Sequence, residues 1–164
     1  MKSVFKFKDN YYPFTYTDHK RIVVRAVLLN DKNEVCLLHL ISDDKCGHRD
    51  CYELPGGGKK KSETFKEGVL REIKEETGFD GKIIKFLAKV EDFYNLIHRE
   101  NHNYYYLVRA KKHTHDNREE YEKKMIHGQK AVYFANGNSR TEILSLPESE
   151  RPRRRGIPFL CAVD

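Results

Sequence analysis

Apolar residues in this chain occur as short runs separated by polar turns. Two such runs, residues 21–30 and residues 34–41, flank Asp31-Lys32-Asn33, which is a typical turn sequence. Apolar runs of this length that are bounded by turns are typical of buried strands, so they predict a buried β-hairpin. Residues 42–50 are mostly polar and predict a loop, after which residues 52–54 lead into a run of glycines.

The next segment has the pattern of one amphipathic helix. Its apolar residues recur at the spacing of a single helix face, at Phe65, Val69, Leu70 and Ile73. Either Ser62 or Thr64 can cap the start of this helix. Gly78 can supply the left-handed residue that ends it. The prediction is therefore one helix of about three to four turns.

Three later segments have the composition of strands: residues 82–94, 103–111 and 131–134. This order of strands around one helix favours an α/β fold with a central mixed sheet covered by that helix. The length of 164 residues suits one domain, which we expect to span residues 1–164. Within it we distinguish an aromatic N-terminal segment, residues 1–19, and a basic C-terminal tail, residues 147–164.

Three glutamates lie toward the C-terminal end of the predicted helix: Glu72, Glu75 and Glu76. Like charges spaced i, i+3 and i+4 repel by about 0.2–0.5 kcal/mol per pair, and the helix dipole disfavours anions at this end. A divalent cation removes both costs, because clustered carboxylate oxygens suit Mg²⁺ bridging to a phosphate. The alternative is a solvated acidic helix face.

Three consecutive glycines, Gly56, Gly57 and Gly58, precede the helix. Glycine lets the backbone approach a ligand closely and turn where other residues would clash. A glycine triplet by itself is typical of a flexible turn. Its position between an apolar strand and the glutamate-bearing helix favours a ligand-binding loop instead.

Loop and helix together form one continuous motif, Gly57-x5-Glu63-x7-Arg71-Glu72-Ile73-x-Glu75-Glu76-x-Gly78-Phe79. This pattern matches the Nudix box without a gap, so the chain resembles Nudix hydrolases, which cut the diphosphate of a nucleoside diphosphate linked to another group. The resemblance implies the Nudix fold, an α/β/α sandwich with a central mixed sheet. It also implies a dependence on Mg²⁺, for which Mn²⁺ can substitute.

The resemblance implies roles for individual residues. The carbonyl of Gly56 would join Glu72, Glu75 and Glu76 as a metal ligand, while Arg71 pairs with Glu63 to hold the loop against the helix. A glutamate from a later loop would complete the catalytic set, and we take Glu120 for this role from the candidates Glu119, Glu120 and Glu122. Substrate contacts are expected from the loop and from a strand tyrosine: Glu53, Gly57, Gly58, Lys59 and Tyr94.

The second face of the sheet has no clear cover in the sequence. Family members usually close it with a C-terminal amphipathic helix, but residues 136–164 contain three prolines and no sustained helical period. The alternatives are a short helix, the aromatic residues of segment 1–19, or a second subunit, which would make the protein a homodimer.

Charge and composition narrow the choice of partners. A net charge of +6, a pI near 9.0 and a basic stretch at residues 151–155 favour anionic partners. A nucleotide substrate fits this charge, and RNA is a more specific alternative. No apolar stretch reaches the roughly 18 residues of a membrane span, and the N-terminus lacks the apolar run of a signal peptide, so we expect a soluble cytoplasmic protein without a membrane partner.

The four cysteines are expected to be reduced thiols in that compartment. Cys46, His48 and Cys51, with His39 nearby, have a faint resemblance to a zinc site. Structural zinc sites usually need four ligands in paired spacings, so this spacing argues against zinc.

The sequence thus predicts a Mg²⁺-dependent hydrolase of the phosphoanhydride bond in a nucleoside diphosphate linked to another moiety or in a nucleoside triphosphate. An RNA 5′-pyrophosphohydrolase is the first alternative. A catalytically silent nucleotide-binding or RNA-binding module on the same fold is the second. Intact Glu72, Glu75 and Glu76 argue against a silent module, because a binder has no reason to keep carboxylates that repel one another.

Overall fold

A computed structural model of the chain describes residues 3–10, 12–44, 47–111 and 129–135. The strands are β1 (Ser3–Phe7), β2 (His19–Leu29), β3 (Val35–Asp44), β4 (Gly47–Glu53), β5 (Gly56–Gly58), β6 (Gly81–Tyr94), β7 (Arg99–Ala110) and β8 (Gln129–Ala135). One helix, α1 (Phe65–Thr77), and one 3₁₀ turn, η1 (Asn95–Ile97), complete the described elements.

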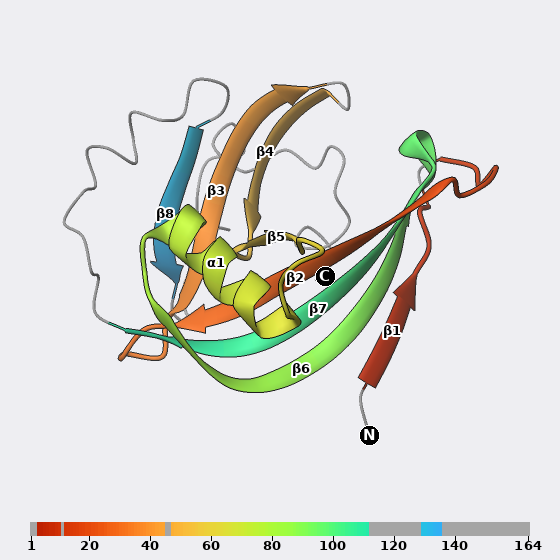
Figure 1. Cartoon of the computed structure of the whole chain (residues 1–164). Helices are drawn as coiled ribbons and strands as arrows, with labels where there is room; N and C mark the ends of the chain where they lie inside the picture. The colour runs from red at the N-terminus through yellow and green to blue at the C-terminus, as the bar shows by residue number, and fades with distance from the viewer. Residues whose placement is uncertain (1–2, 11, 45–46, 112–128, 136–164) are drawn as a thin grey trace.

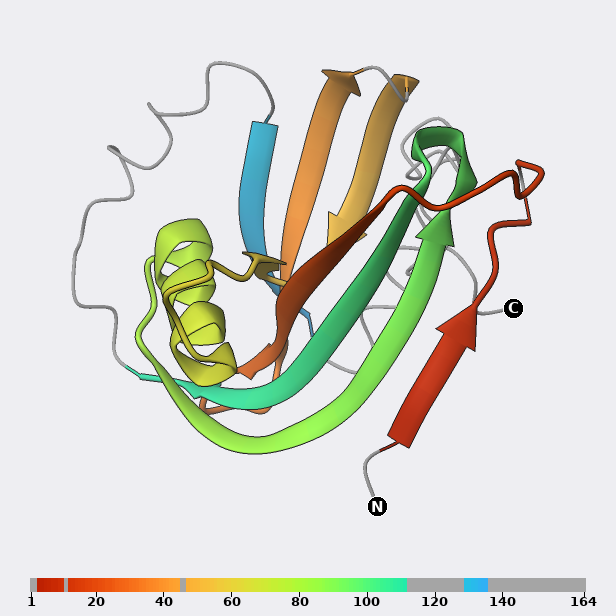
Figure 2. The same ribbon diagram turned by 45° about the vertical axis from the view of Figure 1, so that its right-hand side comes forward.

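The strands form one mixed sheet in the order β1-β6-β7-β2-β3-β4. β5 pairs with β2, and β8 pairs with β3. Two of the pairings, β1 with β6 and β2 with β7, are parallel, while the others are antiparallel. Helix α1 lies against one face of this sheet, and β1 runs along its outer edge (Figures 1 and 2). The predicted mixed sheet covered by the helix is therefore confirmed.

Helix α1 begins and ends where its capping residues predict. Thr64, rather than Ser62, is the N-cap: its hydroxyl accepts a hydrogen bond from the backbone N–H of Glu67, whose carboxylate accepts one from the N–H of Thr64. Gly78 ends the helix in the left-handed region with φ of 72°. Free backbone groups at both ends of α1 are thus hydrogen-bonded by residues of the predicted segment.

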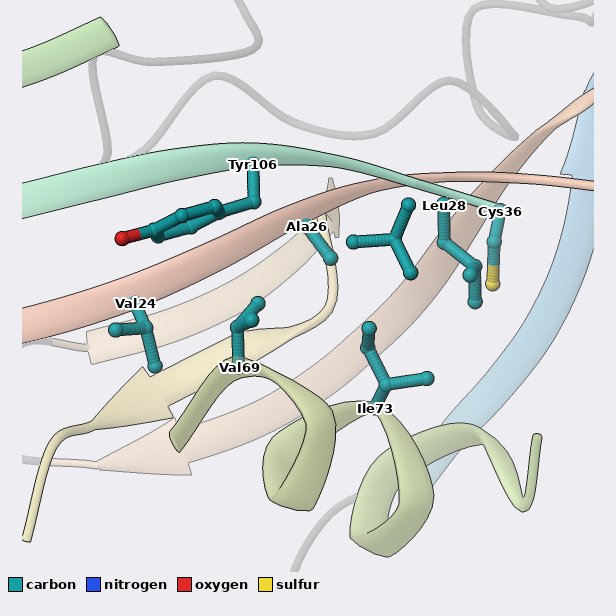
Figure 3. Close-up of a cluster of buried hydrophobic side chains, with 8 residues drawn as sticks. Val24, Ala26, Leu28, Cys36, Val69, Ile73 and Tyr106 are labelled. Carbon is teal, nitrogen blue, oxygen red and sulfur yellow. The ribbon is translucent and has the colours of Figure 1, made fainter. Parts of the chain in front are cut away.

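The hydrophobic core lies between α1 and the sheet (Figure 3). Val69 and Ile73 from the helix pack against buried residues of β2, β3 and β7, which are Val24, Ala26, Leu28, Cys36, Tyr106 and Val108. These β2 and β7 residues alternate along their strands, so the residues between them face the opposite side of the sheet. The core therefore fixes which side chains of β2 and β7 face away from the helix.

Two sequence predictions about the strands were wrong in extent. Within segment 42–50, the described residues 42–44 and 47–50 do not form a loop, because β3 and β4 stay paired from Leu38 opposite Glu53 to Asp44 opposite Gly47. Strand β7 begins at Arg99 rather than at residue 103. In both places polar residues continue a strand, since the hydrogen bonds of a β-ladder come from the backbone and do not require apolar side chains.

The predicted hairpin of residues 21–30 and 34–41 forms only at its turn. β2 and β3 are paired at Leu29 and Val35 and then separate. Beyond that point β2 pairs with β5 and β7, while β3 pairs with β4 and β8. The separation leaves room for the glycines of β5 beside β2.

The N-terminal aromatic segment extends the sheet rather than covering its second face. β1 adds a parallel edge strand next to β6, and its Phe5 and Phe7 are half exposed. In the part of the chain that the structure describes, no helix covers the face opposite α1; the C-terminal residues 136–164 lie outside that part.

Candidate functional site

The glycine strand β5 lies between β2 and α1. It pairs antiparallel with β2, so Gly56 lies opposite Arg25 and Gly58 opposite Val23. At Gly56 the backbone φ is 154°, and an added Cβ would lie 2.2 Å from the carbonyl oxygen of Val24. Only glycine fits at this position without a backbone shift.

The middle glycine, Gly57, contacts the first glutamate of the predicted metal site. An added Cβ at Gly57 would lie 2.7 Å from the carboxylate oxygens of Glu72. Glu72 is only 9% exposed although it carries a charge. Because Gly57 has no Cβ, the buried Glu72 carboxylate can lie directly against the backbone of β5.

Arg71 connects the loop to the helix. Its Nε and Nη2 donate to the two carboxylate oxygens of Glu63 at 2.9 Å each, and Nη2 also donates to the Gly58 carbonyl at 3.1 Å. Its Nη1 lies 2.8 Å from carboxylate oxygens of both Glu72 and Glu75. The predicted contact between Arg71 and Glu63 is thus present, and Arg71 also neutralises part of the repulsion among the helix carboxylates.

The other two glutamates differ in their surroundings. Glu76 accepts a hydrogen bond from the backbone N–H of Gly56 at 2.7 Å, which ties the end of α1 to the start of β5. The side chain of Glu75 is 53% exposed and lies 3.9 Å from the Lys60 ammonium. The helix therefore presents one buried carboxylate, one tied to the glycine strand and one open to solvent.

Protonation equilibria follow from these contacts. The hydrogen bonds from Arg71, followed by the one from the Lys60 backbone N–H, lower the pKa of Glu63 to about 2. The same carboxylate raises the pKa of Arg71 above its ordinary value, with further contributions from Glu72 and Glu75. The pair is therefore fully charged at neutral pH and holds the loop by charge-assisted hydrogen bonds.

The donor set has the chemistry of a site for a hard divalent cation. Carboxylate and carbonyl oxygens are the ligands that Mg²⁺ prefers, and the space left by the missing Cβ of Gly57 adjoins one of them. As the side chains lie here, no three His, Cys, Asp or Glu groups of the described ranges converge on one point. To bind a cation, the three carboxylates must give up some of their present contacts. These are the contacts of Glu72 and Glu75 with Arg71 and the hydrogen bond of Glu76 with the Gly56 N–H.

A cavity of about 500 Å³ lies on the sheet face opposite α1. Its lining comes from the alternate residues of β2, β6 and β7 that point away from the core, from Phe5 and Phe7 of β1, and from residues 51–54. Leu54 lies two residues before Gly56, so the cavity wall continues directly into the glycine strand. Helix carboxylates and cavity thus lie on either side of β5.

The predicted substrate-binding residues divide between these two regions. Glu53 and Tyr94 line the cavity. Gly57 and Gly58 lie in β5, whereas Lys59 turns toward the start of α1, with its ammonium 5.5 Å from the centre of the Phe65 ring. The candidates Glu119, Glu120 and Glu122 and the basic stretch at 151–155 lie outside the described residues.

The cysteines agree in part with the sequence prediction. Cys36 is a free thiol, and burial raises its pKa to about 12. Of the residues considered for zinc, His39 lies 2.6 Å from a carboxylate oxygen of Asp50, while Cys46 and the side chain of His48 lie outside the described residues.

Several polar residues that line the cavity were not among the predicted site residues: Arg21, Arg25, Asp92, Arg99 and Asn101. The available signal was their spacing of two or four residues, with Arg21 and Arg25 in one segment and Arg99, Asn101 and Asn103 in another. Period-two alternation places such residues on one face of a strand. In these strands that face is the one opposite the core.

Comparison with known proteins gives a family match over most of the chain. The NUDIX domain family matches residues 19–133. Nudix hydrolase 6 of Arabidopsis thaliana is 38% identical over 68 residues, which is 42% of this chain and 24% of that protein. ADP-ribose pyrophosphatase of Methanocaldococcus jannaschii is 36% identical over 70 residues, which is 43% of this chain and 39% of that protein. The chain thus spans well under half the length of these relatives.

Solved structures agree on the fold. A NUDIX hydrolase from Nitrosomonas europaea superposes with a TM-score of 0.56 at 15% identity, covering 75% of this chain and 77% of that one. A MutT protein from Methanosarcina mazei Go1 gives a TM-score of 0.51 at 20% identity, covering 82% and 86%. Separately, no helix among the described residues is long and apolar enough to cross a membrane.

The close contact between Gly57 and Glu72 predicts different effects of the same substitution at neighbouring glycines. In Gly57→Ala the new methyl group must displace the Glu72 carboxylate, whereas at Gly58 it meets only the Arg21 guanidinium at 3.4 Å. We expect Gly57→Ala to lower the hydrolysis rate by about tenfold more than Gly58→Ala, with both variants folded. Steady-state kinetics and urea unfolding measure this. Equal losses in both variants would contradict a special role for the Gly57–Glu72 contact.

The lowered pKa of Glu63 predicts a pH-dependent contribution to stability. A carboxylate with a folded pKa near 2 stabilises the fold at all pH values above its unfolded pKa of about 4.5, and this stabilisation is lost as pH falls toward 2. We therefore expect Glu63→Gln to lower the free energy of unfolding at pH 7, with the difference from the wild type vanishing near pH 2. Urea unfolding across this range tests it, and a difference independent of pH would refute it.

Proposed function

Because the chain belongs to the Nudix family, we propose that it is a Mg²⁺-dependent hydrolase of phosphoanhydride bonds, acting on a nucleoside diphosphate linked to another moiety or on a nucleoside triphosphate. One observation carries this proposal. The glycine strand β5 is hydrogen-bonded to Glu76 of the carboxylate helix, and the cavity wall at Leu54 continues directly into it. A substrate that lies across β5 has its phosphates at the carboxylates and its remaining part in the cavity.

The helix carboxylates and the first glycine are the residues that would hold the cation. Glu72, Glu75 and Glu76, with the Gly56 carbonyl, supply the hard oxygens that Mg²⁺ prefers. When bound, Mg²⁺ supplies charge neutralisation for the diphosphate and lowers the pKa of water. Mn²⁺ can substitute, because it accepts the same oxygen ligands.

Arg71 has a positioning role in this proposal. It holds β5 to α1 through Glu63 and the Gly58 carbonyl, and it shares Glu72 and Glu75. Release of Glu72 and Glu75 toward a cation leaves the two hydrogen bonds to Glu63 and the one to Gly58 in place. The loop geometry is thereby maintained while the carboxylates change partners.

The cavity favours a small nucleotide over an RNA strand. A volume of about 500 Å³ accommodates a nucleoside-sized group, and most of its lining is fixed by the strands of the sheet. One relative is named an RNA pyrophosphohydrolase and another an ADP-ribose pyrophosphatase, so names of relatives do not decide between these substrates. Release of nucleoside monophosphate or phosphate from a panel of nucleotides, with triphosphorylated RNA included, separates the two.

The proposal predicts that Glu75→Gln and Glu76→Gln each lower kcat by at least about a hundredfold, while the protein stays folded. Each change removes a carboxylate ligand and also relieves like-charge repulsion, so stability should change little. EDTA should abolish the wild-type activity. Glu67→Gln is the matched control, because it removes one charge from the same helix and an amide can still serve in the capping box.

We expect the Glu67→Gln enzyme to keep its kcat within about threefold of the wild type. Turnover near that of the wild type in Glu75→Gln or Glu76→Gln, on whichever substrate is hydrolysed, would refute the carboxylate assignment.

A further inference from the structure

The cavity on the face opposite α1 has an apolar floor and a polar side. Val23 of β2 and Val90 and Ala88 of β6 contribute apolar surface on either side of β7. Phe5 and Phe7 of β1 line the same cavity and are 50% and 46% exposed. Apolar surface bordered by exposed aromatic rings suits a planar ring, since rings stack on aromatic faces.

The polar side is organised around Asp92. This residue is only 7% exposed and lines the cavity. Its Oδ1 accepts a hydrogen bond from the Asn101 amide at 2.8 Å, and its Oδ2 accepts one from the Asn103 amide at 2.7 Å. Two neutral amides therefore fix the orientation of a buried carboxylate.

Asp92 forms no ion pair within the described ranges, although Arg25 and Arg99 line the same cavity. Burial raises the pKa of Asp92, and the hydrogen bonds from Asn101 and Asn103 oppose this effect. The positive charges of Arg25 and Arg99 also oppose this effect, although neither guanidinium forms an ion pair with Asp92. Burial of a carboxylate is costly unless donors satisfy its oxygens. Since each oxygen has a second lone pair, Asp92 can accept further hydrogen bonds from a ligand.

The neighbouring side chain, Asn101, adds another acceptor. Asn101 uses its amide N–H on Asp92, and its Oδ1 is buried with no hydrogen-bond partner among the residues that the structure describes. Unsatisfied buried acceptors are rare in folded proteins, and a water, an ion or a ligand can supply the missing donor. Arg99, which also lines the cavity, has its Nε buried and without a hydrogen-bond partner among the same residues. The cavity wall therefore offers one unpaired acceptor and one unpaired donor.

We propose, building on the proposed nucleotide hydrolase function, that this cavity binds the base of the substrate and that Asp92, held by Asn101 and Asn103, selects a guanine-type base. Guanine presents two adjacent donors, its ring N1–H and its 2-amino group, which match the two oxygens of a carboxylate. Adenine and cytosine place a donor beside an acceptor, and the acceptor would face Asp92 unpaired. Selection arises because an unpaired polar group in a buried site is costly.

The other polar residues of the cavity fit the rest of a guanine ring. Arg21, Arg25 and Arg99 bring guanidinium donors to the cavity, and arginine is the usual partner of the guanine O6 and N7 acceptors. Phe7 lies beside Asp92 in the β1–β6 pair, in position to stack on a ring bound at Asp92.

The test uses binding rather than turnover. Guanosine, inosine and adenosine 5′-monophosphate are titrated against the wild-type protein by calorimetry. Inosine differs from guanosine only by the missing 2-amino group, so it isolates one of the two donors. We expect guanosine 5′-monophosphate to bind at least about tenfold more tightly than either of the others. Equal affinities, or no binding of any of the three, would overturn the proposal.

Two variants separate edge recognition from stacking. Asp92→Asn should remove the preference for guanosine over inosine, whereas Glu91→Gln should keep it, because Glu91 pairs with Lys6 and Lys89 on the other face of the sheet. Phe7→Ala should weaken all three nucleotides by a similar factor of about five or more, and Phe14→Ala, 64% exposed, should not. A guanosine preference that survives in folded Asp92→Asn contradicts the role of Asp92.

The outcome is separable from the hydrolase function. Hydrolysis of nucleotides without any binding preference for guanine would overturn the base assignment and leave the hydrolase proposal standing. Binding selective for guanine, with no hydrolysis of any guanosine diphosphate derivative or triphosphate, would support the base assignment and overturn the hydrolase proposal.

Discussion

The close approach of the glycine strand β5 to both β2 and α1 is the constraint on which the site depends. At Gly56 any side chain would collide with the Val24 carbonyl, and at Gly57 it would collide with the Glu72 carboxylate. The backbone of β5 therefore lies directly against the helix carboxylates, and Glu76 holds the Gly56 N–H. The cavity wall at Leu54 continues into the same strand. β5 therefore connects the carboxylates, where the phosphates of a substrate would bind, with the cavity, where the rest of the substrate would bind.

Charge balance explains how three glutamates are tolerated at the unfavourable end of a helix. From the sequence we expected a metal ion alone to neutralise the glutamates. In the structure Arg71 neutralises part of their charge by contacting Glu72 and Glu75. The same guanidinium holds Glu63 and the Gly58 carbonyl, so one side chain fixes the loop and stabilises the carboxylates. A cation competes with Arg71 for two of these carboxylates. The interaction of the cation with Glu72 and Glu75 must therefore be stronger than the contacts of these carboxylates with Arg71 that it replaces.

Local sequence patterns predicted helix α1 and the contact between Arg71 and Glu63. The extent of the strands and the lining of the cavity depend instead on pairing between strands that are distant in sequence. Thr64 and Gly78 cap α1 as their chemistry indicates, and Arg71 meets Glu63 as the family resemblance implies. The polar side chains at 42–44, 47–50 and 99–102 argue against strands, yet the backbone ladder includes these residues. The cavity was not predictable, since its lining depends on the register that brings Arg21, Asn101 and Asp92 into one row. Register is set by strands distant in sequence, not by local pattern.

Mn²⁺ binding followed by electron paramagnetic resonance tests the central claim most directly, because it reports on the α1 carboxylates without requiring a known substrate. The account predicts that the wild-type protein and Glu67→Gln bind Mn²⁺ with similar affinity, while Glu75→Gln and Glu76→Gln each bind it at least about tenfold more weakly and remain folded. Mg²⁺ should displace the bound Mn²⁺. Equal Mn²⁺ affinity in all four proteins would contradict the assignment of these carboxylates to a divalent cation.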